Sequence, residues 1–195
     1  QQRRRQSMTQ ARARRERRRW ITLGGAVFAA IVVVAVVAAI VINRRNNQPA
    51  SNITGVESFG GLQRTHVQTP VVYPQTPPVG GPHNPVWQNC GYYSSPVKNE
   101  NAVHSLEHGA VWITYRPDLP ADQVAALRKL AGQTYVLVTP YPDLPAAVVA
   151  SAWGTQLKLE SASDPRLNQF LRTYREGPQT PEKGSACTGG TGLPQ

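Results

Sequence analysis

Two histidines and a glutamate lie together in a segment that the sequence predicts to be helical. Residues 103–109 read Val-His-Ser-Leu-Glu-His-Gly, so that four positions separate His104 from His108. On a helix this spacing places both imidazoles on one face, about one turn apart, which suits two ligands of one metal ion. Glu107 lies three positions after His104, from where its carboxylate can supply an oxygen ligand.

His83 is a further candidate ligand, because it follows a loop rich in proline and glycine that can fold back over this helix. Imidazole ligands suit copper(II) or zinc. We therefore predict one copper or zinc ion, held by His83, His104, Glu107 and His108. In the alternative interpretation, the imidazoles only make hydrogen bonds in a packed junction. His66 lies in a polar segment and is not expected to contribute.

The two cysteines, Cys90 and Cys187, are expected to form a disulfide. An even number of cysteines in an oxidising compartment favours such a bond. It would close a loop of about 100 residues and stabilise the fold by roughly 4.7 kcal/mol in the chain-entropy model. The alternative is that Cys90 is a metal ligand.

The elements that must position these side chains begin near residue 99. Apolar periodicity predicts helices over 99–108 and 118–131, and a third that Asp164 caps and Pro165 begins. Runs of β-branched and apolar residues predict four strands, over 110–115, 135–138, 148–153 and 156–160. The fold class is therefore α+β: one small exported domain with helices on a mixed or antiparallel sheet, preceded by a single transmembrane helix.

The predicted transmembrane helix is an apolar run over residues 21–42. The run contains no charged side chain, and Thr22 is its single polar one. As a helix it would be about 33 Å long, enough for a hydrocarbon core of about 30 Å. It is longer than the core of a cleaved signal peptide, and Arg44 and Arg45 follow it. We divide the chain into a basic cytoplasmic arm (1–20), the transmembrane helix (21–42), a tether (43–69) and an exported domain (70–195).

The distribution of charge sets the predicted topology and excludes one class of partner. The chain holds 21 Lys+Arg against 11 Asp+Glu, a formal net charge of +10, and nine of the arginines fall within residues 1–20. The positive arm should face the cytoplasm, which predicts a single-pass protein of the cell membrane with an exported C-terminal domain. Because residues 46–195 carry equal numbers of acids and bases, we expect no nucleic acid as a partner. The apolar run over residues 21–42 makes the lipid bilayer the expected partner.

No catalytic signature of a known enzyme class is found, so an enzyme is the least favoured hypothesis. The order H-x-x-E-H occurs in inverted zincin peptidases, but here only five residues match it. The first hypothesis is a membrane-anchored metal-binding protein. The alternative is a non-catalytic accessory subunit of a larger membrane complex, with an integral-membrane protein as partner. A weaker hypothesis is a cell-envelope binding module that uses Trp87, Tyr92, Tyr93 and Trp112.

The sequence also resembles a bacterial family of single-pass membrane proteins with an exported domain of unknown function. The most specific matching segments are the Val-His-Ser-Leu-Glu-His-Gly motif and the loop Pro-Pro-x-x-Gly-Pro-His that ends at His83, and the resemblance covers about residues 56–180. It implies a folded, membrane-tethered domain that includes the proline-rich loop, and no established activity. Gly80 stands where the family usually has serine, which removes a hydroxyl close to His83.

Overall fold

The computed structural model of the chain describes Val32 and residues 53–195. Apart from Val32, the predicted basic arm, transmembrane helix and first part of the tether lie outside the described residues. Within the part that is described, no helix has the length and the apolar character that crossing a bilayer requires. Residues 53–195 form one compact unit.

A mixed six-stranded sheet forms the centre of this unit. Its strand order is β1-β6-β5-β3-β4-β2. The central strands β3 and β4 run parallel and are connected through helix α3 (Ala121–Leu130). In contrast, β5 and β6 form an antiparallel pair around a turn at Gly154. The strands are β1 (Val56–Ser58), β2 (Gly91–Tyr92), β3 (Val111–Tyr115), β4 (Val136–Pro140), β5 (Val148–Ala152) and β6 (Thr155–Leu159).

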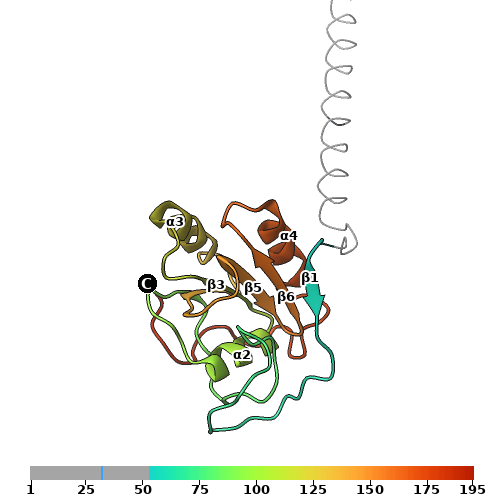
Figure 1. The fold of residues 1–195 in the computed structure, drawn as a ribbon. Coiled ribbons are helices and arrows are strands. Elements are labelled where there is room, and N and C mark those ends of the chain that lie inside the picture. Colours follow the sequence, from blue (N-terminus) through green and yellow to red (C-terminus); the bar gives the residue numbers. More distant parts are fainter. Residues whose placement is uncertain (1–31, 33–52) are drawn as a thin grey trace, which may run out of the picture. The chain divides into compact units, whose positions relative to one another are not determined.

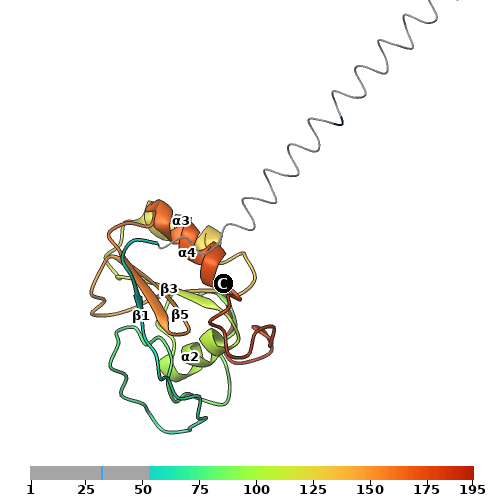
Figure 2. The ribbon, with the colours of Figure 1, turned by 90° about the vertical axis from the view of Figure 1, so that its right-hand side faces the viewer.

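Helices cover both faces of the sheet. Helices α3 (Ala121–Leu130) and α4 (Pro165–Tyr174) lie on one face, and α2 (Asn99–Glu107) lies on the other (Figures 1 and 2). Successive side chains of a strand point to opposite faces. Accordingly Ile113 packs in the cluster that contains Phe170 of α4, while its neighbour Trp112 packs in the cluster that contains α2. The sheet is therefore buried on both sides.

The three helices and four strands predicted after residue 98 are confirmed to within a few residues. The α+β fold is confirmed, and of the two predicted alternatives the sheet is the mixed one. The N-terminus of α4 forms as the sequence indicates, because the Asp164 side chain accepts a hydrogen bond from the Arg166 backbone N–H and Pro165 occupies the first turn. Two short edge strands, β1 and β2, were not predicted. At three and two residues, they are too short for a periodic pattern.

The polar segment before residue 70 belongs in part to the domain. The tether was predicted to extend to residue 69, whereas Ile53 is buried in the core and β1 pairs with β6. The proline-rich loop after it is also ordered against the domain. The Val79 carbonyl accepts a hydrogen bond from the Gly154 N–H (2.8 Å), and the Pro77 carbonyl accepts one from the Gln156 side chain (2.9 Å).

The C-terminal segment (residues 178–195) is tied to the chain around residue 90. Cys90 and Cys187 form the predicted disulfide, and the Cys90 N–H donates a hydrogen bond to the Cys187 carbonyl. Further along, the Thr191 N–H donates to the Trp87 carbonyl (2.9 Å). This segment has no helix or strand of its own, so these links hold it in place.

Candidate metal centre

Helix α2 supplies two side chains of a cluster that could hold a metal ion. Every residue from Asn101 to Glu107 is buried. The chain leaves the helix through Gly109 at φ +109°, where a Cβ would lie 3.1 Å from the Cα of Glu176, so that a larger residue would be strained. His104 and Glu107 are three positions apart and therefore project from neighbouring positions on the helix surface.

His83 reaches the cluster because its loop passes close to the sheet. Gly80 has φ +150°, and a Cβ there would lie 2.7 Å from Leu62 and 3.3 Å from the Trp153 ring. After this close approach, the His83 N–H donates a hydrogen bond to the Thr65 carbonyl (3.0 Å). The His83 side chain is fully buried, with 0% of its surface exposed. The expectation that this loop folds back over α2 is confirmed.

The same backbone pairing brings His66 to the cluster. His66 and His83 form an isolated parallel bridge, and the His66 ring centroid lies 4.9 Å from that of His83 and 4.8 Å from that of His104. The His66 side chain is 47% exposed, so it is the ligand candidate that solvent reaches. Sequence reasoning missed His66, although all four histidines fall between residues 66 and 108.

The four side chains converge closely. One potential ligand atom from each of His66, His83, His104 and Glu107 lies within 4.8 Å of all the others. Glu107 Oε2 is 2.9 Å from His83 Nε2 and 3.9 Å from His66 Nε2. In a tetrahedral site with bonds of about 2.0–2.1 Å, ligand atoms lie roughly 3.3 Å apart. The cluster is therefore close to the required spacing, and pairs of ligand atoms that lie as far as 4.8 Å apart would have to approach each other by up to about 1.5 Å around an ion.

Backbone carbonyls fix which nitrogen of each buried imidazole carries a proton and which is left to bind an ion. His83 Nδ1 donates a hydrogen bond to the Gly81 carbonyl (2.8 Å), and His104 Nδ1 donates one to the Asn84 carbonyl (2.7 Å). Because a carbonyl oxygen only accepts, both Nδ1 atoms carry a proton, and in a neutral ring Nε2 then has a free lone pair. Metal-binding histidines in proteins are oriented by the same kind of second hydrogen bond.

The His104 imidazole is also kept neutral. Burial lowers the pKa of His104 to about 4, the hydrogen bond to the Asn84 carbonyl opposes this shift, and the neighbouring histidines lower the pKa further. At neutral pH the ring therefore carries no proton on Nε2. Metal ligation requires this state, because a protonated imidazole has no lone pair to donate.

Glu107 is a buried carboxylate with few partners. Its side chain is 2% exposed, and within residues 53–195 its hydrogen-bond partner is His83 Nε2. A carboxylate that is removed from water needs a counter-charge or several hydrogen bonds. Since His83 Nδ1 already carries a proton, the contact between Nε2 and Glu107 requires one additional proton. A metal ion at this place would replace that proton.

His108 does not join the cluster, although the sequence predicted it as a ligand together with His104. Its Nδ1 donates to the Ala186 carbonyl (2.6 Å), and its Nε2 faces Glu182 Oε2 at 3.7 Å. The rings of His104 and His108, four positions apart, are adjacent, with centroids 4.5 Å apart. Their nitrogens nevertheless contact different partners. The arrangement therefore also differs from that of an H-x-x-E-H peptidase, in which both histidines bind one ion.

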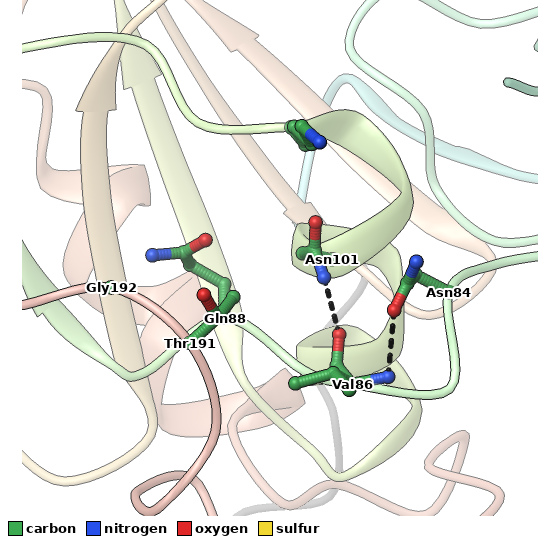
Figure 3. A pocket seen from close by; sticks show the side chains of 7 residues that line it. Asn84, Val86, Gln88, Asn101, Thr191 and Gly192 are labelled. Atoms are coloured by element: carbon green, nitrogen blue, oxygen red, sulfur yellow. Dashed lines mark hydrogen bonds between the residues drawn. The ribbon is translucent and has the colours of Figure 1, made fainter. Parts of the chain in front are cut away.

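A polar cavity lies beside the cluster without including it. It has a volume of about 390 Å³ and is lined by Asn84, Val86, Gln88, Lys98, Asn101, Thr191 and Gly192. Figure 3 shows that Asn101 and Asn84 both bond to the backbone of Val86. These bonds fix the loop whose Asn84 carbonyl orients His104, so one wall of the cavity supports the cluster.

The aromatic residues predicted for a binding surface are mostly core residues. Trp112, Tyr92 and Tyr93 are buried and pack in the two hydrophobic clusters. That prediction is wrong for these three, because strand and helix packing covers them. Trp87 instead lies against the histidines, with its ring centroid 5.0 Å from that of His108 and 5.7 Å from that of His104.

Comparison with known proteins identifies a family. The family described as "Protein of unknown function (DUF3105)" matches residues 66–189, a range that includes all four histidines, Glu107 and both cysteines. No curated protein and no solved structure matches the chain.

Proposed function

Because the chain belongs to the DUF3105 family, whose function is unknown, we propose its function from its own residues: it binds one copper(II) or zinc ion through His66, His83, His104 and Glu107. Three imidazoles and one carboxylate suit either metal. The proposal replaces His108 of the sequence-based ligand set with His66.

The orientation of the two buried imidazoles is the observation that carries this proposal. His83 and His104 each donate Nδ1–H to a backbone carbonyl, which leaves Nε2 as the nitrogen of each ring that has a lone pair for an ion. Glu107 completes the arrangement with a buried carboxylate close to His83 Nε2. Without a metal ion, the lone pairs of His83 Nε2 and His104 Nε2 and the negative charge of Glu107 would have to share a single proton.

Four protein ligands would fill a tetrahedral coordination shell. Structural zinc sites have this closed form, whereas catalytic sites keep one position for water or substrate. We therefore assign the site a binding role without catalysis. The exposed His66 gives an ion a route to the three buried ligands, so the ion can exchange with solvent or with another protein.

The proposed place of action is the exported side of the cell membrane, with residues 21–42 as the anchor. Two observations support this proposal: the apolar run in the sequence and the disulfide between Cys90 and Cys187, a bond typical of exported proteins. A fusion of alkaline phosphatase to the C-terminus tests the topology, because this enzyme is active only after export. An inactive fusion that is present at normal amounts would contradict the proposal.

Metal uptake by the full chain in detergent tests the proposed function. After exposure to excess Zn²⁺ or Cu²⁺ and gel filtration, the variant His83→Gln/His104→Gln should lose the tightly bound ion that the wild type retains. Glu100→Gln is a matched control, since Glu100 lies on the same helix and accepts a hydrogen bond from the Val71 N–H outside the cluster. It should retain the ion. Equal metal content in all three proteins, with unchanged far-UV spectra, would refute the proposal.

A further inference from the structure

A second pair of metal-ligating side chains lies at the C-terminal end of α2. His108 Nε2 and Glu182 Oε2 are 3.7 Å apart, which is longer than a hydrogen bond. His108 is buried, and the Glu182 side chain is 49% exposed. The pair therefore lies at the boundary between the interior and solvent, outside the cluster described above.

The His108 imidazole has the same orientation as the two buried imidazoles of the cluster. Its Nδ1 donates to the Ala186 carbonyl, at 2.6 Å, so a neutral ring presents a lone pair at Nε2. A lone pair and a carboxylate oxygen that face each other do not attract unless a cation or a proton lies between them. Their separation is close to the roughly 3.3 Å between two ligands of one tetrahedral ion.

Both ligands depend on the C-terminal segment. Glu182 is held beside α2 because its backbone N–H donates to the Glu107 carbonyl (3.0 Å). Ala186, whose carbonyl orients His108, immediately precedes Cys187 of the disulfide. The geometry of this pair is thus determined by how the C-terminal segment is attached, whereas the side-chain hydrogen bonds of His83 and His104 involve partners within residues 81–107.

We infer that His108 and Glu182 form a second binding site for a divalent transition-metal ion, weaker than the four-residue cluster and dependent on the Cys90–Cys187 disulfide. Two protein ligands leave the remaining positions to water, so the ion is held less tightly than by four. An ion bound here would join α2 to the C-terminal segment.

Binding stoichiometry of the full chain in detergent tests this site, with Zn²⁺ as the probe in equilibrium dialysis. The wild type should bind about two ions with different affinities, one per site. Glu182→Gln and His108→Gln should each bind only the tighter ion. Glu57→Gln is the matched control: its side chain is also 49% exposed and pairs with a cation, Lys158. It should still bind both ions.

The disulfide provides an independent test. The double variant Cys90→Ser/Cys187→Ser introduces no thiol ligand, and it should lose the weaker ion while it retains the tighter one. Glu182→Gln and His108→Gln variants that bind as many ions as the wild type, whether one or two, would overturn the second site. Because Glu182 is exposed, its variant is not expected to unfold.

Failure of this inference and failure of the proposed function give different results. If the four-residue cluster does not bind metal, His83→Gln leaves the binding curve unchanged, while Glu182→Gln still removes an ion. If the second site does not exist, His83→Gln removes the tight ion, and Glu182→Gln has no effect.

Discussion

Replacing Glu107 by glutamine separates a metal site from a structural ion pair. Glu107 is buried, and its hydrogen-bond partner among the described residues is His83 Nε2, at 2.9 Å. Glutamine has nearly the same shape, but its side-chain N–H can donate to His83 Nε2 while His83 Nδ1–H continues to donate to the Gly81 carbonyl. The metal-free variant would then contain a neutral network in which each of these atoms has a partner.

The two interpretations differ by several kcal/mol in the stability of the metal-free protein. If Glu107 and His83 form a structural ion pair, the substitution removes one partner of a buried pair, which costs about 3–5 kcal/mol. If the carboxylate is present for a metal ion, the metal-free variant should unfold with a free energy within about 1 kcal/mol of the wild type, because its hydrogen bonds are conserved.

Addition of metal should make the wild type more stable than the Glu107→Gln variant. An ion at about 100 times its dissociation constant stabilises the wild type by about 2.7 kcal/mol. For a unit that spans residues 53–195, this corresponds to a rise of about 5–10 °C in the midpoint of thermal unfolding. Glu107→Gln should show a much smaller rise, because it lacks the anionic ligand.

The assay is thermal and urea unfolding of the full chain in detergent, followed by circular dichroism, first with EDTA and then with Zn²⁺. Glu100→Gln on the same helix is the control and should behave as the wild type in both conditions. A loss of about 3 kcal/mol or more for Glu107→Gln in EDTA, together with no effect of Zn²⁺ on the wild type, would refute our interpretation of the cluster.

Three further predictions concern the supports of the site. The pKa of His104 is about 4 in the folded chain, below the ordinary value of about 6.5 that applies in the unfolded chain. Between these two pH values only the unfolded chain binds the proton, so the metal-free protein should lose stability as the pH falls from 6.5 to 4. The loss from this residue should be at most about 3 kcal/mol. Urea unfolding as a function of pH should show that His104→Gln loses this component, and parallel curves for the two proteins would contradict the assignment. Gly80→Ala should cost about 1–3 kcal/mol, because φ is +150° and the added Cβ meets Leu62, and it should also weaken Zn²⁺ binding by displacing His83. Gly60→Ala, where no atom lies within 4 Å of the added Cβ, is its control, and equal effects of the two would disprove the role of the close approach. Loss of the disulfide in Cys90→Ser/Cys187→Ser should lower the unfolding free energy by about 2–5 kcal/mol, and an unchanged urea midpoint would show that the C-terminal segment is held without it.

Local patterns in the sequence predicted most of the regular structure. Helix α4 is determined by the cap at Asp164, the proline after it and an apolar face that includes Phe170. These signals depend on neighbouring residues, so they can be recognised before the fold is known. The edge strands β1 and β2 exist only because β6 and β4 offer them backbone partners, and their sequences carry no comparable signal.

For the candidate site, the sequence by itself determined that His104 and Glu107 lie close together, because one helical turn sets their separation. The disulfide also followed from composition, since the chain has two cysteines. Only the tertiary structure decided the remaining partners. His66 enters the cluster through a backbone bridge to His83, and His108 is directed to Glu182 by a carbonyl 78 residues away in sequence. Helical spacing fixes the position of each side chain on the helix surface. The partner of each ring nitrogen depends instead on chain segments that are distant in sequence and come together only on folding.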